Sequence, residues 1–134
     1  MSTPFRTPEG GRIDRATTVE FTFDGQPLTG HPGDTLASAL LAHGVHRTST
    51  SIKLGRPRGV AAAWAEDPSS LVQIEEPFPE PMLLATTVEL YDGLVGHGLP
   101  GQGRLAEVPD SARYDAVHHH VDVLVVGAGP AGLA

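Results

Sequence analysis

The sequence predicts an α+β domain followed by the first strand of an α/β domain. Two observations favour this fold class. A hairpin pattern and a helical pattern follow each other in the first third of the chain, and a glycine-rich turn follows an apolar run at its end. The chain has 134 residues, 40% of them apolar, which suits one domain with a modest core and a fraction of a second.

The first expected element is a β-hairpin, after a polar arm at residues 1–15. In TTVEFTF, residues 17–23, apolar and polar side chains alternate, and this period of two indicates a half-buried strand. Asp24-Gly25 is a strong turn signal, because a tight hairpin needs residues that tolerate positive φ. QPLTG, residues 26–30, is expected to be the return strand.

A short helix is expected next. Its apolar stripe at helical spacing comprises Leu36, Ala39, Leu40 and His43. We expect Asp34 to cap its start by accepting hydrogen bonds from first-turn amides, and Gly44 to end it with a left-handed residue. A hairpin followed by a crossing helix is typical of a β-grasp domain, which we expect over residues 16–95.

Three further short strands are expected after a polar, basic loop at residues 46–58. Their sequences are GVAAAWA (59–65), SLVQIEE (70–76) and MLLATTVELYDG (82–93). Residues 93–113 then carry five glycines and two prolines in 21 residues, which is typical of a linker. We therefore expect residues 96–120 to connect the domain to the next one.

The last segment, VDVLVVGAGPAGLA at residues 121–134, has the pattern of a buried parallel strand followed by G-x-G-x-x-G. In such a turn the first glycine allows the tight bend, the second lets a pyrophosphate approach the backbone, and the third lets helix and strand pack closely. The candidate cofactor-binding residues are Gly127, Ala128, Gly129, Pro130, Ala131 and Gly132. The acidic ribose ligand expected about 20 positions further on is outside this chain, so we interpret residues 121–134 as the start of a truncated dinucleotide-binding domain.

Composition excludes several function classes. A net charge of -7 argues against nucleic-acid binding, and no apolar run is long enough to span a membrane. The first residues lack the apolar core of a signal peptide, so a cytoplasmic location is expected. The sequence has no cysteine, so we expect neither a disulfide, nor a cysteine nucleophile, nor an iron–sulfur cluster.

An ordered set of motifs over nearly the whole chain carries a family resemblance. The motifs are GGRIDR, FTFDGQPLTGHPGDTLASALLAHGVH, GRPRG, VELYDGL and RYDAVHHHVDVLVVGAGPAGLA. Together they resemble the start of the alpha subunit of heterotetrameric sarcosine oxidase. The resemblance implies a plant-ferredoxin-like β-grasp domain followed by a Rossmann-type FAD/NAD(P)-binding domain.

The resemblance also implies a reaction, cofactors and partners. The full enzyme would oxidatively demethylate sarcosine to glycine, with formation of hydrogen peroxide and methylenetetrahydrofolate. NAD would bind the alpha subunit, FMN and FAD would belong to the assembled enzyme, and tetrahydrofolate would be a co-substrate. The partners would be the beta, gamma and delta subunits. The 134-residue chain holds none of the catalytic residues and is expected to be inactive alone.

In cluster-bearing relatives, the loop after RPRG supplies cysteines spaced C-x4-C-x2-C, with a fourth downstream. That spacing falls here on Ala62, Asp67 and Ser70, and the fourth position falls near Thr86. Because none is a cysteine, the resemblance implies a ferredoxin-like domain without a cluster. We expect Trp64 to fill the vacated space as a core residue.

Two other groups have alternative interpretations. Four of the nine basic residues lie within twelve positions: Arg47, Lys53, Arg56 and Arg58. They could contact another subunit or a cofactor phosphate, or they could lie in a solvated loop whose arginine stems cover apolar surface. The triplet His118–His120 could bind a metal ion or could pack where the linker meets the sheet. We favour packing, because neighbouring side chains on an extended chain point to opposite faces and do not easily converge on one ion.

Two alternatives to the sarcosine oxidase hypothesis stay open. The first is a subunit of another secondary-amine, opine or proline-type dehydrogenase, because no substrate pocket lies in this chain. The second is a non-enzymatic β-grasp interaction module.

Overall fold

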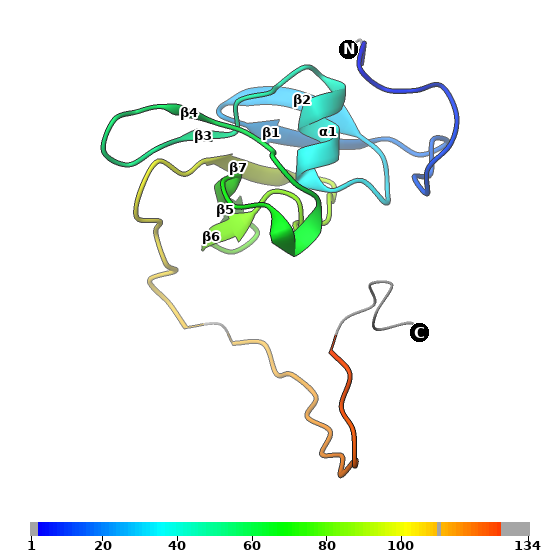
Figure 1. Cartoon of the computed structure of the whole chain (residues 1–134), viewed down its shortest axis with the longest axis vertical. Helices are drawn as coiled ribbons and strands as arrows, with labels where there is room; N and C mark the ends of the chain where they lie inside the picture. Colours follow the sequence, from blue (N-terminus) through cyan, green and yellow to red (C-terminus); the bar gives the residue numbers. More distant parts are fainter. Residues whose placement is uncertain (1–2, 110, 127–134) are drawn as a thin grey trace.

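The computed structural model describes residues 3–109 and 111–126. Its body is a five-stranded mixed sheet with strand order β2-β1-β7-β5-β6 and one helix, α1, lying across a face of the sheet (Figure 1). A separate two-stranded hairpin, β3 and β4, extends from the body (Figure 1). No helix among the described residues is long and apolar enough to cross a membrane.

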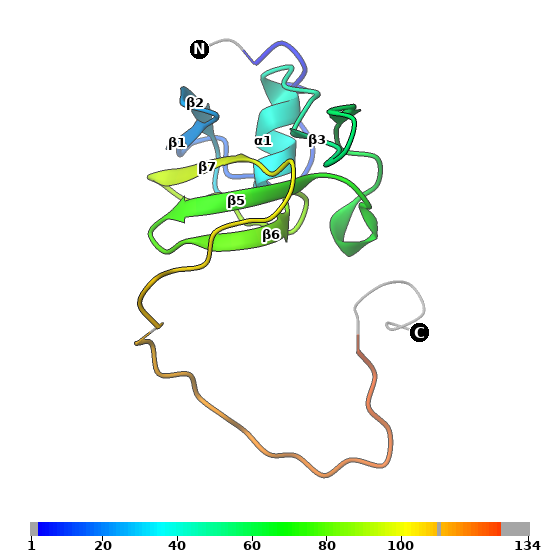
Figure 2. The same ribbon diagram turned by 90° about the vertical axis from the view of Figure 1, so that its left-hand side faces the viewer.

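The elements have the following bounds: β1 Val19–Phe23, β2 Gln26–Gly30, α1 Leu36–Ala42, β3 Ser49–Thr50, β4 Pro57–Arg58, a 3₁₀ turn Trp64–Glu66, β5 Leu71–Glu76, β6 Glu80–Leu84 and β7 Leu94–Gly98. In the sheet, β1 and β7 are parallel, while the other neighbours are antiparallel. Figure 2 shows β7, β5 and β6 side by side, with α1 on one face of the sheet.

The predicted hairpin is confirmed. Phe21 of β1 lies opposite Leu28 of β2, and the turn residues Asp24 and Gly25 both have positive φ, of 48° and 75°. Phe21 and Phe23 are buried while Glu20 is exposed, as the alternation predicted. The hairpin could be predicted from local signals, because the turn chemistry and the alternation specify the same register.

The predicted helix is confirmed, but its cap is a different residue. Thr35, not Asp34, is the N-cap: its side chain accepts from the Ser38 amide, and the Ser38 hydroxyl accepts from the Thr35 amide. Asp34 instead accepts hydrogen bonds from the Arg6 guanidinium, the His31 amide and the Ser38 hydroxyl. Gly44 follows the helix with a φ of 78°, as expected.

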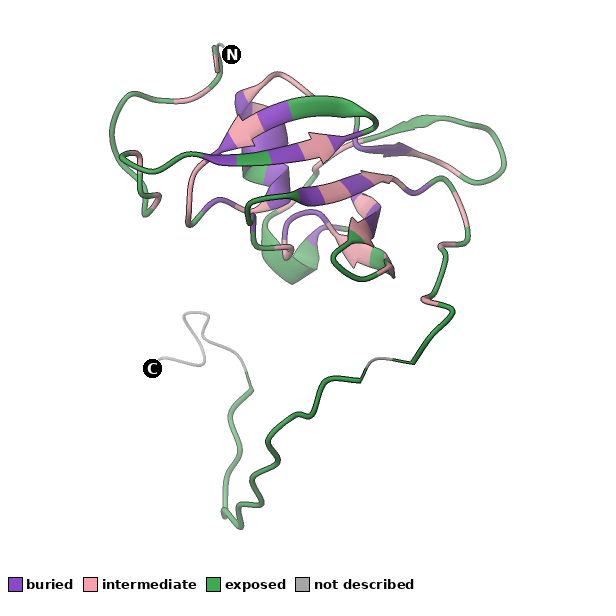
Figure 3. Ribbon diagram, turned by 180° about the vertical axis from the view of Figure 1, so that it is seen from behind, coloured by how far each residue is buried: buried purple, intermediate pink, exposed green. Residues whose placement is uncertain are grey.

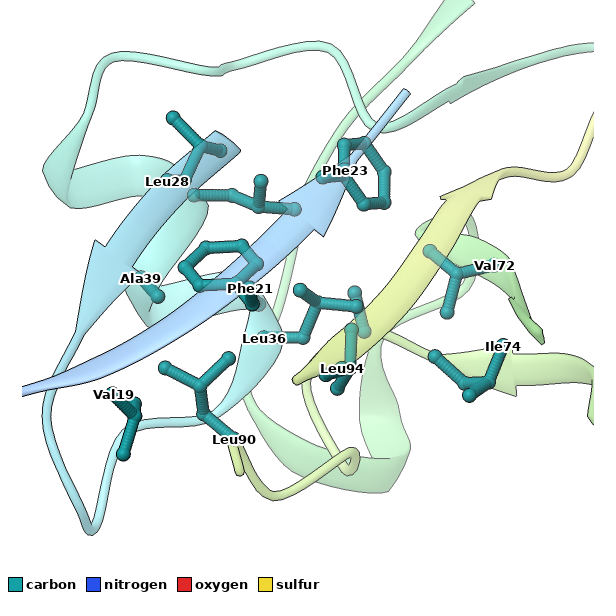
Figure 4. Packing of buried hydrophobic residues seen from close by; sticks show 13 residues of the cluster. Val19, Phe21, Phe23, Leu28, Leu36, Ala39, Val72, Ile74, Leu90 and Leu94 are labelled. Carbon is teal, nitrogen blue, oxygen red and sulfur yellow. The ribbon is translucent and has the colours of Figure 1, made fainter. Parts of the chain in front are cut away.

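The core lies between α1 and the sheet. Leu36 and Leu40 of the helix are fully buried and belong to one cluster with residues of β1, β5 and β7. Figure 4 shows Leu36 among these residues. The cluster includes Val19, Phe21, Phe23, Leu28, Val72, Ile74, Leu90 and Leu94. Its members come from both ends of the domain, so the core closes only when β7 pairs between β1 and β5.

Strand β7 lies where the glycine content suggested a linker. It runs from Leu94 to Gly98, across the boundary expected between residues 95 and 96. A Cβ atom at Gly98 would lie 2.0 Å from the Thr48 carbonyl oxygen. Glycine is therefore needed there for a close backbone approach, which is one of the roles that glycine has inside strands. The domain boundaries themselves stay predictions.

Two strand predictions are wrong in detail. GVAAAWA forms a loop that ends in the 3₁₀ turn Trp64–Glu66, and the third expected strand is shifted, since β6 spans Glu80–Leu84. The loop differs because its amides bond to a side chain instead of a neighbouring strand. The expected basic loop contains the short β3–β4 pair.

Residues 99–109 and 111–126, here called the tail, form neither helix nor strand. Residues 121–126, expected to be a buried strand, are exposed, and Val126 is 87% exposed (Figure 3). A central parallel strand needs neighbours on both sides to satisfy its backbone groups, and none lies beside it in the described chain. The expectation of a strand at these residues is therefore not met here.

Candidate functional site

The loop between β4 and β5 brings together the four positions that the family resemblance singled out. The Asp67 carboxylate accepts hydrogen bonds from the amides of Ala62 and Ser70. Thr86, in the chain after β6, donates its hydroxyl to the Trp64 carbonyl oxygen of the same loop. The Ser70 carbonyl oxygen accepts from the Ala85 amide at 2.9 Å, so the two segments are directly bonded. The positions from Ala62 to Thr86, which are 24 residues apart in the sequence, therefore belong to one site.

Asp67 is the centre of this loop. Its Oδ1 accepts from the amides of Ala61 and Ala62 at 2.9 and 3.3 Å, and its Oδ2 accepts from the Ser70 amide at 3.0 Å. The Ser70 hydroxyl donates a further short hydrogen bond to Oδ2. Asp67 is only 3% exposed and Ser70 is fully buried. A single carboxylate therefore satisfies donors from both ends of the loop.

The charge of Asp67 is stabilised in place. Burial by itself would raise the pKa of Asp67, but hydrogen bonds from the Ser70 hydroxyl and from the backbone amides outweigh it and hold that pKa below the ordinary value of 3.8. The carboxylate is thus ionised at neutral pH. With its lone pairs occupied by loop donors, it is suited to organising the backbone and not to proton transfer.

The prediction that Trp64 is a core residue is wrong. Trp64 is 66% exposed and has a φ of 55° in the 3₁₀ turn. Its carbonyl oxygen accepts from the Thr86 hydroxyl at 2.6 Å, which fixes the backbone while the indole faces outward. The buried side chains of this loop are those of Asp67 and Ser70 instead.

The basic residues lie on or beside the β3–β4 hairpin. Arg58 is in β4, Arg56 precedes it, Lys53 is in the connecting turn and Arg47 precedes β3; all four are exposed. In the described chain none of them forms an ion pair. The structure therefore gathers these cations on one projecting element without pairing them.

The remaining predicted positions are the glycine-rich turn and the histidine triplet. The candidate cofactor-binding residues Gly127, Ala128, Gly129, Pro130, Ala131 and Gly132 lie outside the described residues. His118–His120 are exposed, so the expected packing against the sheet is not observed. Within residues 3–109 and 111–126, no group of three or more His, Cys, Asp or Glu side chains is placed to hold a metal ion.

Two polar contacts were missed from the sequence. Asp34, 2% exposed, is paired with Arg6 of the N-terminal arm at 2.7 Å. Gln73, 1% exposed, accepts from the Arg104 amide at 2.7 Å and donates to the Arg104 carbonyl oxygen at 2.9 Å. Each ties a segment outside the sheet to the body, and neither has a local motif that reveals it.

Comparisons with known proteins define the class of this fold. A family model described as a 2Fe-2S iron-sulfur cluster binding domain matches residues 16–97, more than half of the chain. The chain belongs to this family. The mixed sheet with little helix agrees with the ferredoxin-like α+β domain expected from the sequence.

Among curated proteins the chain is similar to sarcosine oxidase alpha subunits. It is 48% identical to that of Corynebacterium sp. (strain U-96) over 93% of this chain, 45% identical to that of Corynebacterium sp. (strain P-1) over 100%, and 34% identical to that of Rhizobium meliloti (strain 1021) over 97%. These matches confirm the resemblance inferred from the motifs. The chain spans only 13%, 15% and 18% of the length of these three relatives.

A solved structure shares the fold. L-proline dehydrogenase from P. horikoshii matches with a TM-score of 0.53 and 24% identity, over 72% of this chain and 18% of that chain. At this identity the match supports the architecture alone.

The cofactor prediction needs correction. We expected NAD, FMN, FAD and tetrahydrofolate, and no iron–sulfur cluster; the family model points instead to an iron–sulfur domain, so that prediction is wrong as it stood. A cluster is not shown either, because the sequence has no cysteine. The four positions offer a methyl group, a carboxylate and two hydroxyls, with the carboxylate already bonded to four loop donors. These residues do not fit a group that is held by four thiolates.

Proposed function

We propose that this chain is the N-terminal part of a sarcosine oxidase alpha subunit, in a flavin-type oxidoreductase that oxidatively demethylates sarcosine to glycine and forms hydrogen peroxide. The observation that supports this best is identity of 45% to 48% to two such subunits over nearly the whole chain. The similarity covers the described domain as well as the tail, so it does not depend on one short motif.

Residues 121–134 would begin the next domain of the longer protein. The glycines Gly127, Gly129 and Gly132 would form the turn on which a dinucleotide pyrophosphate rests against helix amides. This proposal explains why the apolar residues 121–126 have no sheet to join within the described chain. In the complete domain, neighbouring strands would satisfy their backbone groups.

The partners would be the other subunits of a hetero-oligomer, since the relatives are named as alpha subunits. The 134-residue chain would have no oxidase activity by itself. The described loop around Asp67 supports this, because its carboxylate is fully engaged in hydrogen bonds that hold the loop.

The test is to purify the full-length protein with its companion subunits and to measure oxygen uptake and hydrogen peroxide with sarcosine and with L-proline. The 134-residue chain is assayed in parallel. We expect peroxide from the assembly with sarcosine and none from the chain alone. Turnover of L-proline without sarcosine turnover would replace this function by that of a proline-type dehydrogenase. If neither amine is turned over and no companion subunit is found, the remaining hypothesis is a non-enzymatic interaction module.

A further inference from the structure

The β3–β4 hairpin presents an exposed surface that lies apart from the five-stranded sheet. It extends from the body as an arm in two opposite views (Figures 1 and 3). Ile52 and Leu54 in its connecting turn are 70% and 68% exposed. Large aliphatic side chains at a projecting tip contribute nothing to the core of this domain, so their burial requires another surface.

The arm is ordered by its own hydrogen bonds. The Ser51 amide donates to the Arg56 carbonyl oxygen at 2.8 Å, and the Ser51 hydroxyl accepts from the Arg56 amide at 3.0 Å. The Gly55 amide closes the turn onto the Ser51 carbonyl oxygen at 3.0 Å. At the base of the arm, the Ser49 hydroxyl donates to the Ser69 carbonyl oxygen at 3.2 Å, and this bond ties the hairpin to the loop before β5. A tip held in one conformation loses less entropy when it binds.

Charge distinguishes this arm from the rest of the chain. Residues 47–58 contain four basic residues and no acidic one, in a chain whose net charge is -7. Lys53, Arg56 and Arg58 have no ion pair within the described residues. Exposed cations beside exposed aliphatic side chains match a surface that has carboxylates around an apolar centre.

A groove of about 480 Å³ lies at the base of the arm. It is lined by residues of the hairpin, β5, β6 and the chain after β7, including Ile52, Arg58, Leu71, Met82 and Leu99. Met82 is 59% exposed at this groove. The groove continues the apolar tip toward the sheet, so an inserted side chain from a partner would contact both.

We propose that the tip of the β3–β4 hairpin and this groove, here called the hairpin surface, bind an acidic surface with an apolar centre on a companion polypeptide. The proposal rests on the proposed function, which supplies the companion subunits. Nucleic acid fits less well, because a phosphate backbone gives Ile52 and Leu54 no apolar partner and the net negative charge of the chain repels it.

The experiment uses the full-length protein purified from its own cells. The polypeptides that accompany the wild type are identified by mass spectrometry, and their dissociation constant is measured at increasing salt. The variants are Arg56→Glu, which reverses an unpaired charge, and Ile52→Ser, which removes an apolar contact. Arg12→Glu is the matched control, since Arg12 is exposed and lies outside the hairpin.

We expect each hairpin variant to weaken the complex about tenfold or more, which is the effect of losing one central contact, while the control changes it less than twofold. Arg56→Glu should also reduce the salt dependence. A photo-crosslinker at position 54 should attach to a companion peptide that contains acidic residues. Unchanged circular dichroism of the variants would exclude misfolding as the cause.

Two failures are distinguishable. If the wild type assembles and the hairpin variants assemble equally well, the hairpin surface is not the docking site, while the proposed function stands. If the wild type has no companion polypeptide, both proposals are overturned. Hairpin-dependent binding to duplex DNA or to phosphatidylserine vesicles that exceeds binding to the companion would also overturn this inference.

Discussion

The loop around Asp67 allows a quantitative test of how this domain is held together. Asp67→Ala removes the acceptor for all four loop donors, while Asp67→Asn keeps the side-chain shape but replaces one acceptor oxygen by an amide. In the asparagine variant the Ser70 amide and hydroxyl, or the amides on the other side, lose their acceptor. Glu66→Gln is the matched control, because it removes an exposed carboxylate from the residue immediately before Asp67.

The magnitude follows from the hydrogen bonds and the burial of Asp67. A hydrogen bond to a charged group contributes about 1.5–3 kcal/mol net, and such contributions within one network do not add fully. Since the loop amides near Ala61 lie close to solvent and can recruit water, we expect Asp67→Ala to cost about 3 kcal/mol and Asp67→Asn about 2 kcal/mol. The control should stay within about 0.5 kcal/mol of the wild type.

The measurements are urea unfolding by circular dichroism and amide hydrogen exchange in the 134-residue chain. If the loop opens locally, a loss of about 2 kcal/mol accelerates exchange of the Ala61, Ala62 and Ser70 amides about 30-fold. Exchange at the wild-type rate, together with an unfolding midpoint equal to that of Glu66→Gln, would refute the reasoning. The loop would then be held by its backbone contacts and not by the carboxylate.

The pH dependence has a definite sign. The pKa of Asp67 is lowered in the folded state, so its contribution to stability is present above the ordinary value of 3.8 and is lost as the pH falls through the folded-state pKa. The stability difference between wild type and Asp67→Asn should therefore be constant from about pH 7 to 5 and shrink as the pH falls below about 4. A difference that grows on acidification would contradict the assignment.

Three further substitutions test contacts outside this loop. Gly98→Ala places a Cβ against a backbone carbonyl and should cost about 2 kcal/mol or more in urea unfolding; an unchanged midpoint would disprove the close approach. Arg6→Ala leaves buried Asp34 without its cation, so stability should drop by about 3 kcal/mol and the Asp34 pKa, followed by NMR, should rise. Gln73→Ala should accelerate exchange of the Arg104 amide at least about tenfold, and an unchanged rate would show that other contacts hold this segment.

The elements that were predicted correctly carry their signals within a few residues. In the β1–β2 hairpin, the alternation from Val19 to Phe23 and the Asp24-Gly25 turn specify the same structure. The helix is specified by its apolar stripe and by Gly44, which takes the positive φ that ends it. The cap was misassigned by one residue because Asp34 and Thr35 both suit that position, and the distant Arg6 decides between them by pairing with Asp34.

The elements that were missed depend on contacts that composition does not reveal. Gly96 and Gly98 favoured a linker, yet they lie in β7. At Gly98 the Thr48 carbonyl oxygen comes too close for a side chain, and at Gly96 a Cβ atom would lie 3.0 Å from the Gln73 carbonyl oxygen. The stretch around Trp64 was apolar enough for a strand, but its amides are taken by Asp67. The contacts of β7 join segments far apart in the sequence, and those of Asp67 run from one side chain to loop amides five and six residues before it, so neither set follows a pattern in local composition.

The hairpin, the helix, strand β5 and the family could all be predicted from the amino-acid sequence, because they depend on local patterns and on motifs in order along the chain. The placement of β7, the contacts of Ala62 and Ser70 with the Asp67 carboxylate, the bond from Thr86 to Trp64 and the projection of the basic hairpin all depend on the tertiary structure. The physical reason is that a long-range contact is favourable only when the rest of the core fixes both partners, so its signal is absent from either segment alone.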